Sequence, residues 1–90
     1  MTGAPITLCV LTAAGLAFED QAISVVAPGE LGYLGVLRNH APLVTTLKSG
    51  KLSWKRPDGS ERAVQVGEGL FEIAHNRCTL LTTDIKETAA

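Results

Sequence analysis

The residues of this 90-residue chain that could carry chemistry are few and scattered. Only two imidazoles, His40 and His75, could act as a general base or a metal ligand. The sequence holds no serine-centred nucleophile motif, no His-x-Glu pair and no Cys-x-x-Cys pair. The carboxylate pair Glu19-Asp20 is predicted to lie at a turn between strands as solvated charge. We therefore expect no catalytic residues and no metal site, and we do not expect an enzyme.

The stretch "GELGYLGVLRNHAPL" (Gly29 to Leu43) carries three glycines three positions apart. A phosphate-binding loop would end in Lys-Ser/Thr and lead into a helix, and neither follows here. The glycines instead allow close approach of a partner or a positive φ, with a simple double turn as the alternative. Leu31, Tyr33 and Leu34 add the apolar and aromatic groups typical of an interface. The alternative for Tyr33 is a half-buried position within its own domain.

The end of this stretch has the residues of a defined corner. Pro42 disfavours a helical conformation at Ala41 and so fixes how the next strand leaves the corner. Asn39 can occupy a left-handed turn position. His40 is predicted to be a hydrogen-bonding turn or interface residue. Trp54 is placed in the core, with a contact role as the alternative.

Composition excludes several classes of function. Eight basic and nine acidic residues nearly cancel, whereas a nucleic-acid-binding protein usually carries a basic excess. No apolar run approaches the roughly 18 residues of a membrane span. The first residues have no signal-peptide layout, so we expect a cytoplasmic protein. Cys9 and Cys78 are predicted to be buried free thiols, with a disulfide or a metal site as the alternatives.

The apolar pattern along the chain has the short period of β-strands. The runs are rich in β-branched residues or alternate, and turn residues such as Pro57-Asp58-Gly59-Ser60 separate them. About eight to ten short strands at near-regular spacing predict an all-β sandwich or barrel. The clearest runs are Ile6–Thr12, Ala22–Ala27, Leu43–Lys48, Lys51–Arg56, Arg62–Val66, Leu70–His75 and Cys78–Thr83.

One segment, "GVLRNHAPLVTTLKSGKL" (Gly35 to Leu52), resembles a family signature close to G-x-L-P-N/G-H-A-P-L-x-T-x-L-x-x-G. This is the signature of the epsilon subunit of F-type ATP synthase. The blocks "LCVLTAAGLAFED", "ISVVAPG" and "VQVGEGLFEIAHNRCTLLTTD" resemble the same family in the same order. The resemblance extends over roughly residues 6 to 84.

The resemblance implies a flattened ten-stranded β-sandwich over residues 1–84, followed by a short tail at 85–90. The helical hairpin that usually follows in the family would be absent, either because this is a short form of the subunit or because the chain has been trimmed. The chain would be a non-catalytic rotor subunit that links the gamma subunit to the membrane c-ring and supports coupling of proton translocation to ATP synthesis. It would need no cofactor and would share its complex with the catalytic alpha and beta subunits. Its place would be peripheral, on the cytoplasmic face of the bacterial inner membrane.

The resemblance also assigns site residues. The loop from Gly32 to Arg38 would face the c-ring, with Tyr33 and Leu34 as its apolar tip; the residues concerned are Gly32, Tyr33, Leu34, Gly35 and Arg38. The gamma-binding residues would be Thr12, His40, Ala41, Pro42 and Leu43. The chain departs from the family at Arg38, where proline is common, and at Tyr33, near which an acidic residue is frequent. An alternative function is a small ligand-binding β-barrel that uses the Gly29–Leu43 loop.

Overall fold

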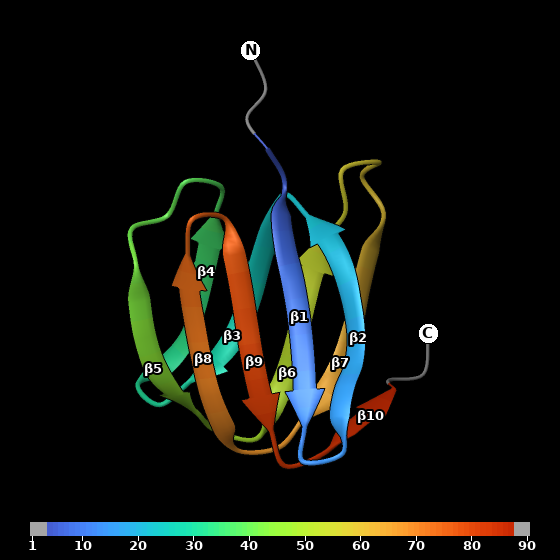
Figure 1. Cartoon of the computed structure of the whole chain (residues 1–90), viewed down its shortest axis with the longest axis vertical. Coiled ribbons are helices and arrows are strands. Elements are labelled where there is room, and N and C mark those ends of the chain that lie inside the picture. Colours follow the sequence, from blue (N-terminus) through green and yellow to red (C-terminus); the bar gives the residue numbers. More distant parts are fainter. Residues whose placement is uncertain (1–3, 88–90) are drawn as a thin grey trace.

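Ten strands make up the regular structure of residues 4–87, the part of the chain that the computed structural model describes (Figure 1). No helix occurs among these residues, so the predicted all-β fold with ten strands is confirmed. The strands are β1 (Ile6–Thr12), β2 (Gly15–Ala22), β3 (Ser24–Gly29), β4 (Gly32–Leu37), β5 (Leu43–Leu47), β6 (Gly50–Lys55), β7 (Glu61–Val66), β8 (Gly69–Ala74), β9 (Arg77–Thr82) and β10 (Ile85–Glu87).

The strands form one sheet that curls over into two layers. Its order is β10-β7-β6-β3-β5-β8-β9-β1-β2, with β4 paired to β3. The sheet turns over between β3 and β5, which share the single pair Gly29↔Leu47. We call β5-β8-β9-β1-β2 the front layer and β10-β7-β6-β3-β4 the back layer, as Figure 1 shows them. All neighbouring strands are antiparallel except β1 and β9, which are parallel.

Alternation along the strands places the core between the layers. In the front layer Phe71, Ile73 and Leu80 are fully buried while their sequence neighbours face outward. The back layer contributes Val25 and Leu52, also fully buried. Each such side chain stabilises the fold by roughly 1.5–3 kcal/mol through removal of apolar surface from water. Trp54 is 5% exposed, so its predicted core position is confirmed.

The segment predicted as the Gly32–Arg38 loop is mostly a strand. β4 pairs with β3 along its whole length, and Glu30-Leu31 forms the two-residue turn between Gly29 and Gly32. The expectation of a loop was wrong because its glycines were interpreted only as turn signals. Gly32 does adopt a φ of +128°, which favours glycine, but Val36 is 1% exposed and anchors β4 to the core.

Two other segments also differ from the expected layout. Glu19 and Asp20 do not lie at a turn; they are inside β2, which pairs with β1. The sheet also extends beyond residue 84, because Ile85–Glu87 form β10 and pair with β7. Ile85 packs against the core, which gives this short strand a reason to join the sheet. The rest of the predicted tail, residues 88–90, lies outside the described residues.

The β8–β9 turn is formed by His75 and Asn76, one position earlier than the sequence indicates. Ala74 pairs with Arg77, and both residues between them have positive φ, 51° for His75 and 60° for Asn76. Two positive φ values define a type I′ turn, which Asn and Gly fit and most other residues resist. His75 therefore occupies a strained position.

Replacing His75 by asparagine should raise the free energy of unfolding by about 0.5–1 kcal/mol, because Asn adopts a left-handed conformation more readily. The urea midpoint of the purified chain measures this change. Asn76 is left intact, so the turn keeps its other contacts. A lower midpoint for His75→Asn would contradict the assignment of strain to His75.

Candidate functional site

The predicted gamma-binding residues lie at the two ends of the front layer. β1 is parallel to β9, and β8 is antiparallel to both β9 and β5, so β1 and β5 run in the same direction. Thr12 ends β1, where its Oγ1 accepts a hydrogen bond from Ala14 N at 3.2 Å. Leu43 begins β5 and therefore lies at the opposite end (Figure 1). The structure does not bring Thr12 together with the His40–Leu43 segment.

The predicted ring-facing residues are spread in the same way along β4. Gly32 begins this strand, near the β1–β2 turn end of the molecule, and Arg38 follows its other end. Tyr33 and Leu34 are inside β4, so they are not the tip of a loop. The tip is Glu30-Leu31, and Leu31 is fully exposed. Leu31 was expected to be one of the apolar groups of this stretch but was not among the predicted ring-facing residues.

Tyr33 is held against its own sheet. Its hydroxyl accepts a hydrogen bond from Lys51 N at 3.0 Å, and its pairing partner in β3 is Pro28. A Cβ added to Gly50 would meet Pro28 Cβ at 2.7 Å and the Tyr33 hydroxyl at 2.8 Å, so the tyrosine lies directly over this glycine. Tyr33 nevertheless stays 61% exposed. It ties the β3–β4 hairpin to β6 while much of its side chain stays in contact with solvent.

The segment from Asn39 to Pro42, which we call the His40 corner, is built from short hydrogen bonds. His40 N donates to Leu37 O at 3.2 Å, and His40 Nδ1 lies 2.6 Å from Ala41 O. Asn39 has a φ of 65°, so its predicted left-handed position is confirmed. The Asn39 backbone N donates to Asn76 Oδ1 at 2.6 Å, and Asn76 Nδ2 donates to Asn39 Oδ1 at 3.0 Å.

The outer surface of the front layer carries an exposed apolar row that the sequence analysis did not identify. Pairing places Leu16 beside Leu11, Leu11 beside Leu81, and Leu81 beside Leu70. Leu16, Leu81 and Leu70 are 59%, 47% and 49% exposed. We call these four leucines the leucine row. It crosses four neighbouring strands, and Thr46 continues it onto β5 opposite Leu70. Such contiguous apolar exposure marks an interaction surface.

The same surface becomes polar toward the His40 corner. The next row of paired residues is Val44, Glu72, Thr79, Cys9 and Glu19. The third row is Ala74, Arg77, Thr7 and Gln21. The front layer thus offers a graded surface, apolar near Thr12 and mostly polar in the next two rows, where Val44 is the exposed apolar exception on β5. This grading suits a protein partner, because interfaces combine an apolar centre with a polar rim.

The two cysteines are buried free thiols, as predicted. Cys78 faces the core, and burial raises the pKa of its thiol to about 12. Cys9 faces the outer side, where it lies 3.5 Å from Glu19 Oε1. Burial and this hydrogen bond raise the pKa of the Cys9 thiol as well. Neither thiol is activated as a nucleophile.

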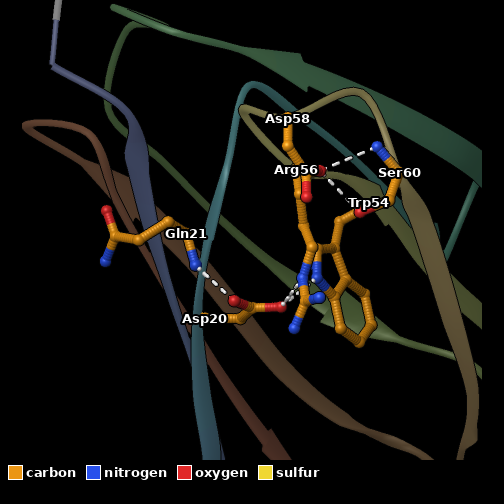
Figure 2. A network of polar contacts seen from close by, with 6 residues as sticks. All are labelled: Asp20, Gln21, Trp54, Arg56, Asp58 and Ser60. Atoms are coloured by element: carbon orange, nitrogen blue, oxygen red, sulfur yellow. Dashed lines mark hydrogen bonds and ion pairs between the residues drawn. The ribbon is translucent and has the colours of Figure 1, made fainter.

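At the edge of the sandwich formed by β2, Asp20 links the front layer to the back layer (Figure 2). Its Oδ2 accepts hydrogen bonds from Trp54 Nε1 and from Arg56 Nε, both at 2.8 Å, and its Oδ1 accepts one from Gln21 N at 2.9 Å. Phe18 stacks on Trp54 with ring centroids 5.3 Å apart. These contacts join β2 to β6 across the seam where the sheet does not close. The sequence reasoning missed this network.

The seam holds a groove of about 620 Å³ between β2 and the β7–β10 edge, lined by the Asp20 network together with Arg62 and Ile85. Burial raises the pKa of the Asp20 carboxyl, but the hydrogen bonds from Arg56, Trp54 and Gln21 and the charge of Arg56 lower it more, so the pKa lies below its usual value. Asp20 is therefore a charged structural link. Across residues 4–87, no cluster of three His, Cys, Asp or Glu side chains could hold a metal ion.

Comparison with known proteins gives a family match over nearly the whole chain. The model of the ATP synthase delta/epsilon chain β-sandwich domain matches residues 5–88. The ATP synthase epsilon chain of Chlorobaculum tepidum is 42% identical over 79 residues, which are 88% of this chain and 90% of that protein. That of Chlorobium limicola is 40% identical over 87% of this chain and 89% of that protein. The Dichelobacter nodosus chain is 35% identical, and only 50% of its length is matched.

Solved structures with the same fold come from ATP synthase complexes. One is a chain of the Euglena gracilis mitochondrial ATP synthase, OSCP/F1/c-ring, with a TM-score of 0.87 at 17% identity. The match covers 97% of this chain and 56% of that one, so this chain spans little more than half of its length. Another is a chain of the Tetrahymena thermophila central stalk and c-ring, with a TM-score of 0.72 at 14% identity, covering 97% of this chain and 69% of that one. At such identities the likeness shows the fold. No helix in the described part of the chain is long and apolar enough to cross a membrane.

Proposed function

Because this chain belongs to the ATP synthase delta/epsilon family and matches 90% and 89% of the epsilon chains of Chlorobaculum tepidum and Chlorobium limicola, we propose that it is an epsilon-type rotor subunit. In this role it links the gamma subunit to the c-ring in the central stalk and supports the coupling of proton translocation to ATP synthesis. It contributes no catalytic residues, and the catalytic alpha and beta subunits belong to the same complex. Its place is the cytoplasmic face of the bacterial inner membrane, reached through its partners.

The observation that carries this proposal is the leucine row on the front layer. A monomeric domain gains nothing from exposing Leu16, Leu81 and Leu70 along one row of paired residues, whereas a subunit attached to a partner buries them. The row starts beside Thr12, and the same surface reaches the strand that follows the His40 corner. The two groups of predicted gamma-binding residues are thus the two ends of one surface, which we assign to the gamma subunit.

The ring contact is assigned to the tip of the β3–β4 hairpin. Leu31 is fully exposed there, and Glu30 Oε1 accepts a hydrogen bond from Thr46 Oγ1 at 3.0 Å, which steadies the tip against β5. Gly32 and Tyr33 adjoin the tip and remain in this site. Arg38 is separated from the tip by the length of β4, so its predicted ring contact does not fit the same contact area.

Charge introduced into the leucine row tests the proposal. Leu70→Glu places a carboxylate at the β8 end of the row, beside Leu81, and is expected to weaken binding to purified gamma subunit by roughly tenfold or more, as substitution of a buried interface anchor does. The unchanged chain is expected to co-elute with gamma on a sizing column at micromolar concentration. Titration calorimetry gives the two affinities.

Leu37→Glu is the matched control, because Leu37 is also an exposed strand leucine, at 67%, but belongs to the back layer. Its affinity for gamma should equal that of the unchanged chain. Equal affinities for Leu70→Glu and Leu37→Glu would remove the leucine row from the gamma interface. Separate elution of the unchanged chain and gamma would overturn the proposed function.

The alternative of a ligand-binding barrel is not favoured. The Gly29–Leu43 segment proposed to hold the ligand is a hairpin followed by the His40 corner. The hollow beside its tip is a shallow feature of about 310 Å³ lined partly by backbone glycines. Side chains of the front and back layers fill the space between the two layers.

A further inference from the structure

Asn76 connects three segments that are distant in sequence. Its side chain exchanges two hydrogen bonds with Asn39, at 2.6 and 3.0 Å, across 37 positions of the chain. Its backbone oxygen accepts a hydrogen bond from Thr7 N at 2.8 Å, at the start of β1. The β8–β9 turn, the first strand and the His40 corner therefore meet at this one residue.

The His40 corner depends on this connection for its position. The hydrogen bonds of His40 are local, since they reach only Leu37 and Ala41. Within the described chain, residues 39–42 are joined by hydrogen bonds to an element other than the preceding strand β4 only through Asn39. Pro42 lacks an N–H and cannot add one. Without the Asn39–Asn76 pair, the corner would be fixed at its two ends alone.

The pair uses both ends of the Asn76 amide. Its Oδ1 accepts a hydrogen bond from the Asn39 backbone N–H while its Nδ2 donates another to Asn39 Oδ1, whereas an ionised carboxylate has no proton to donate. Both residues also have left-handed backbones, with φ of 65° and 60°. Such positions disfavour most side chains, and Asn is among the few that adopt them readily.

We propose that Asn76 is a positioning residue for partner binding, which holds the His40 corner in the orientation that the gamma subunit recognises. The identity of the partner, the gamma subunit, rests on the proposed function. The hydrogen bonds that hold the corner do not depend on it. Asn76 itself need not touch gamma. A preorganised corner binds more tightly because less conformational freedom is lost when the complex forms.

Asn76→Gly separates positioning from folding, because glycine accepts a φ of 60° without strain and removes only the side chain. Amide hydrogen exchange of residues 38–43 in the isolated chain should become about tenfold faster as the corner opens more often. The affinity for gamma should fall by roughly fivefold through loss of preorganisation. The thermal midpoint should fall by no more than about 10 °C, since a tenfold change in opening corresponds to about 1.4 kcal/mol and the chain stays folded.

His75→Gly is the matched control, since it changes the neighbouring residue of the same turn and leaves the amide pair intact. It should alter neither the exchange of residues 38–43 nor the affinity for gamma. Asn39→Gly should reproduce Asn76→Gly, and the double variant should bind no more weakly than either single variant, because both remove one interaction.

The outcomes distinguish this inference from the proposed function. If the unchanged chain binds gamma and Asn76→Gly binds equally well, the positioning role is wrong. If exchange in the His40 corner is the same in Asn76→Gly and His75→Gly, the amide pair does not hold the corner, and the inference also fails. If the unchanged chain does not bind gamma at all, the proposed function fails. The role of Asn76 in binding gamma then fails as well.

Discussion

Replacing Gly69 by alanine is expected to destabilise the chain by about 3 kcal/mol, the upper end of the usual cost of overpacking. Gly69 begins β8 and lies between Leu47 of β5 and Thr82 of β9. A Cβ at this position would overlap the backbone carbonyl oxygen of Leu81 and approach Thr82 Cα to 2.9 Å. These are backbone atoms, so no side-chain rotation can relieve the clash, and the β8–β9 pairing must shift.

Urea unfolding of Gly69→Ala measures this effect, with Gly35→Ala as the matched control. Gly35 is also a strand glycine, but a Cβ there would have no neighbour within 4 Å. Its replacement should change the free energy of unfolding by less than about 0.5 kcal/mol. Equal midpoints for the two variants would show that β9 accommodates a side chain at position 69.

Replacing Asp20 by alanine is expected to cost about 2–3 kcal/mol, because hydrogen bonds to a charged group contribute more than neutral ones and their loss leaves partners unpaired. Trp54 would keep a buried indole N–H without an acceptor, and Arg56 would lose its carboxylate. Arg56 is 34% exposed, so water would replace part of its lost contact, whereas the indole is nearly inaccessible. Most of the cost therefore comes from Trp54.

The acid sensitivity of folding provides an independent readout for Asp20. The pKa of its carboxyl is lower in the folded chain than the ordinary value of 3.8. The stability it contributes is thus fully present above that ordinary value and is lost as pH falls through the folded-state pKa. Between about pH 4 and pH 2, Asp20→Asn should lose less stability than the unchanged chain.

Glu61→Gln is the control for this titration, because Glu61 is an exposed carboxylate of β7 and its loss changes the net charge by the same amount. An identical acid response for Asp20→Asn and Glu61→Gln would show that Asp20 does not couple protonation to folding.

Most of the sheet was predictable from local pattern, and its edges were not. β1 and β6 to β9 have apolar residues on one side and turn residues at their ends, so their runs were located to within a residue or two. β2 was missed because one of its faces is largely exposed and it carries Glu19 and Asp20 side by side. β4 was missed because Gly32 and Gly35 interrupt the apolar pattern. β10 is only three residues long, below what a periodic signal can reveal.

Only the part of the candidate site that has a local sequence pattern was predicted. The His-Ala-Pro-Leu signature located the corner, but the leucine row is assembled from residues of four strands and has no signal along the chain. Its members become neighbours only through the pairing register. The Asp20 network had a weak local signal, since Phe18, Asp20 and Ala22 alternate with Glu19 and Gln21. An aspartate between two apolar residues on the inward face indicates a buried partner.

The parallel pairing of β1 with β9 also bears on how the protein is synthesised. Thr7 pairs with Arg77, so β1 cannot pair with β9 until the ribosome has added about 70 further residues. Until then β1 has β2 as its only paired strand and is not joined to the rest of the sheet, and an isolated two-stranded hairpin is marginally stable in water. The nascent chain must therefore emerge almost completely before the sandwich can close, and long-range pairing of this kind slows folding. During translation its apolar strands are exposed to chaperones and to aggregation.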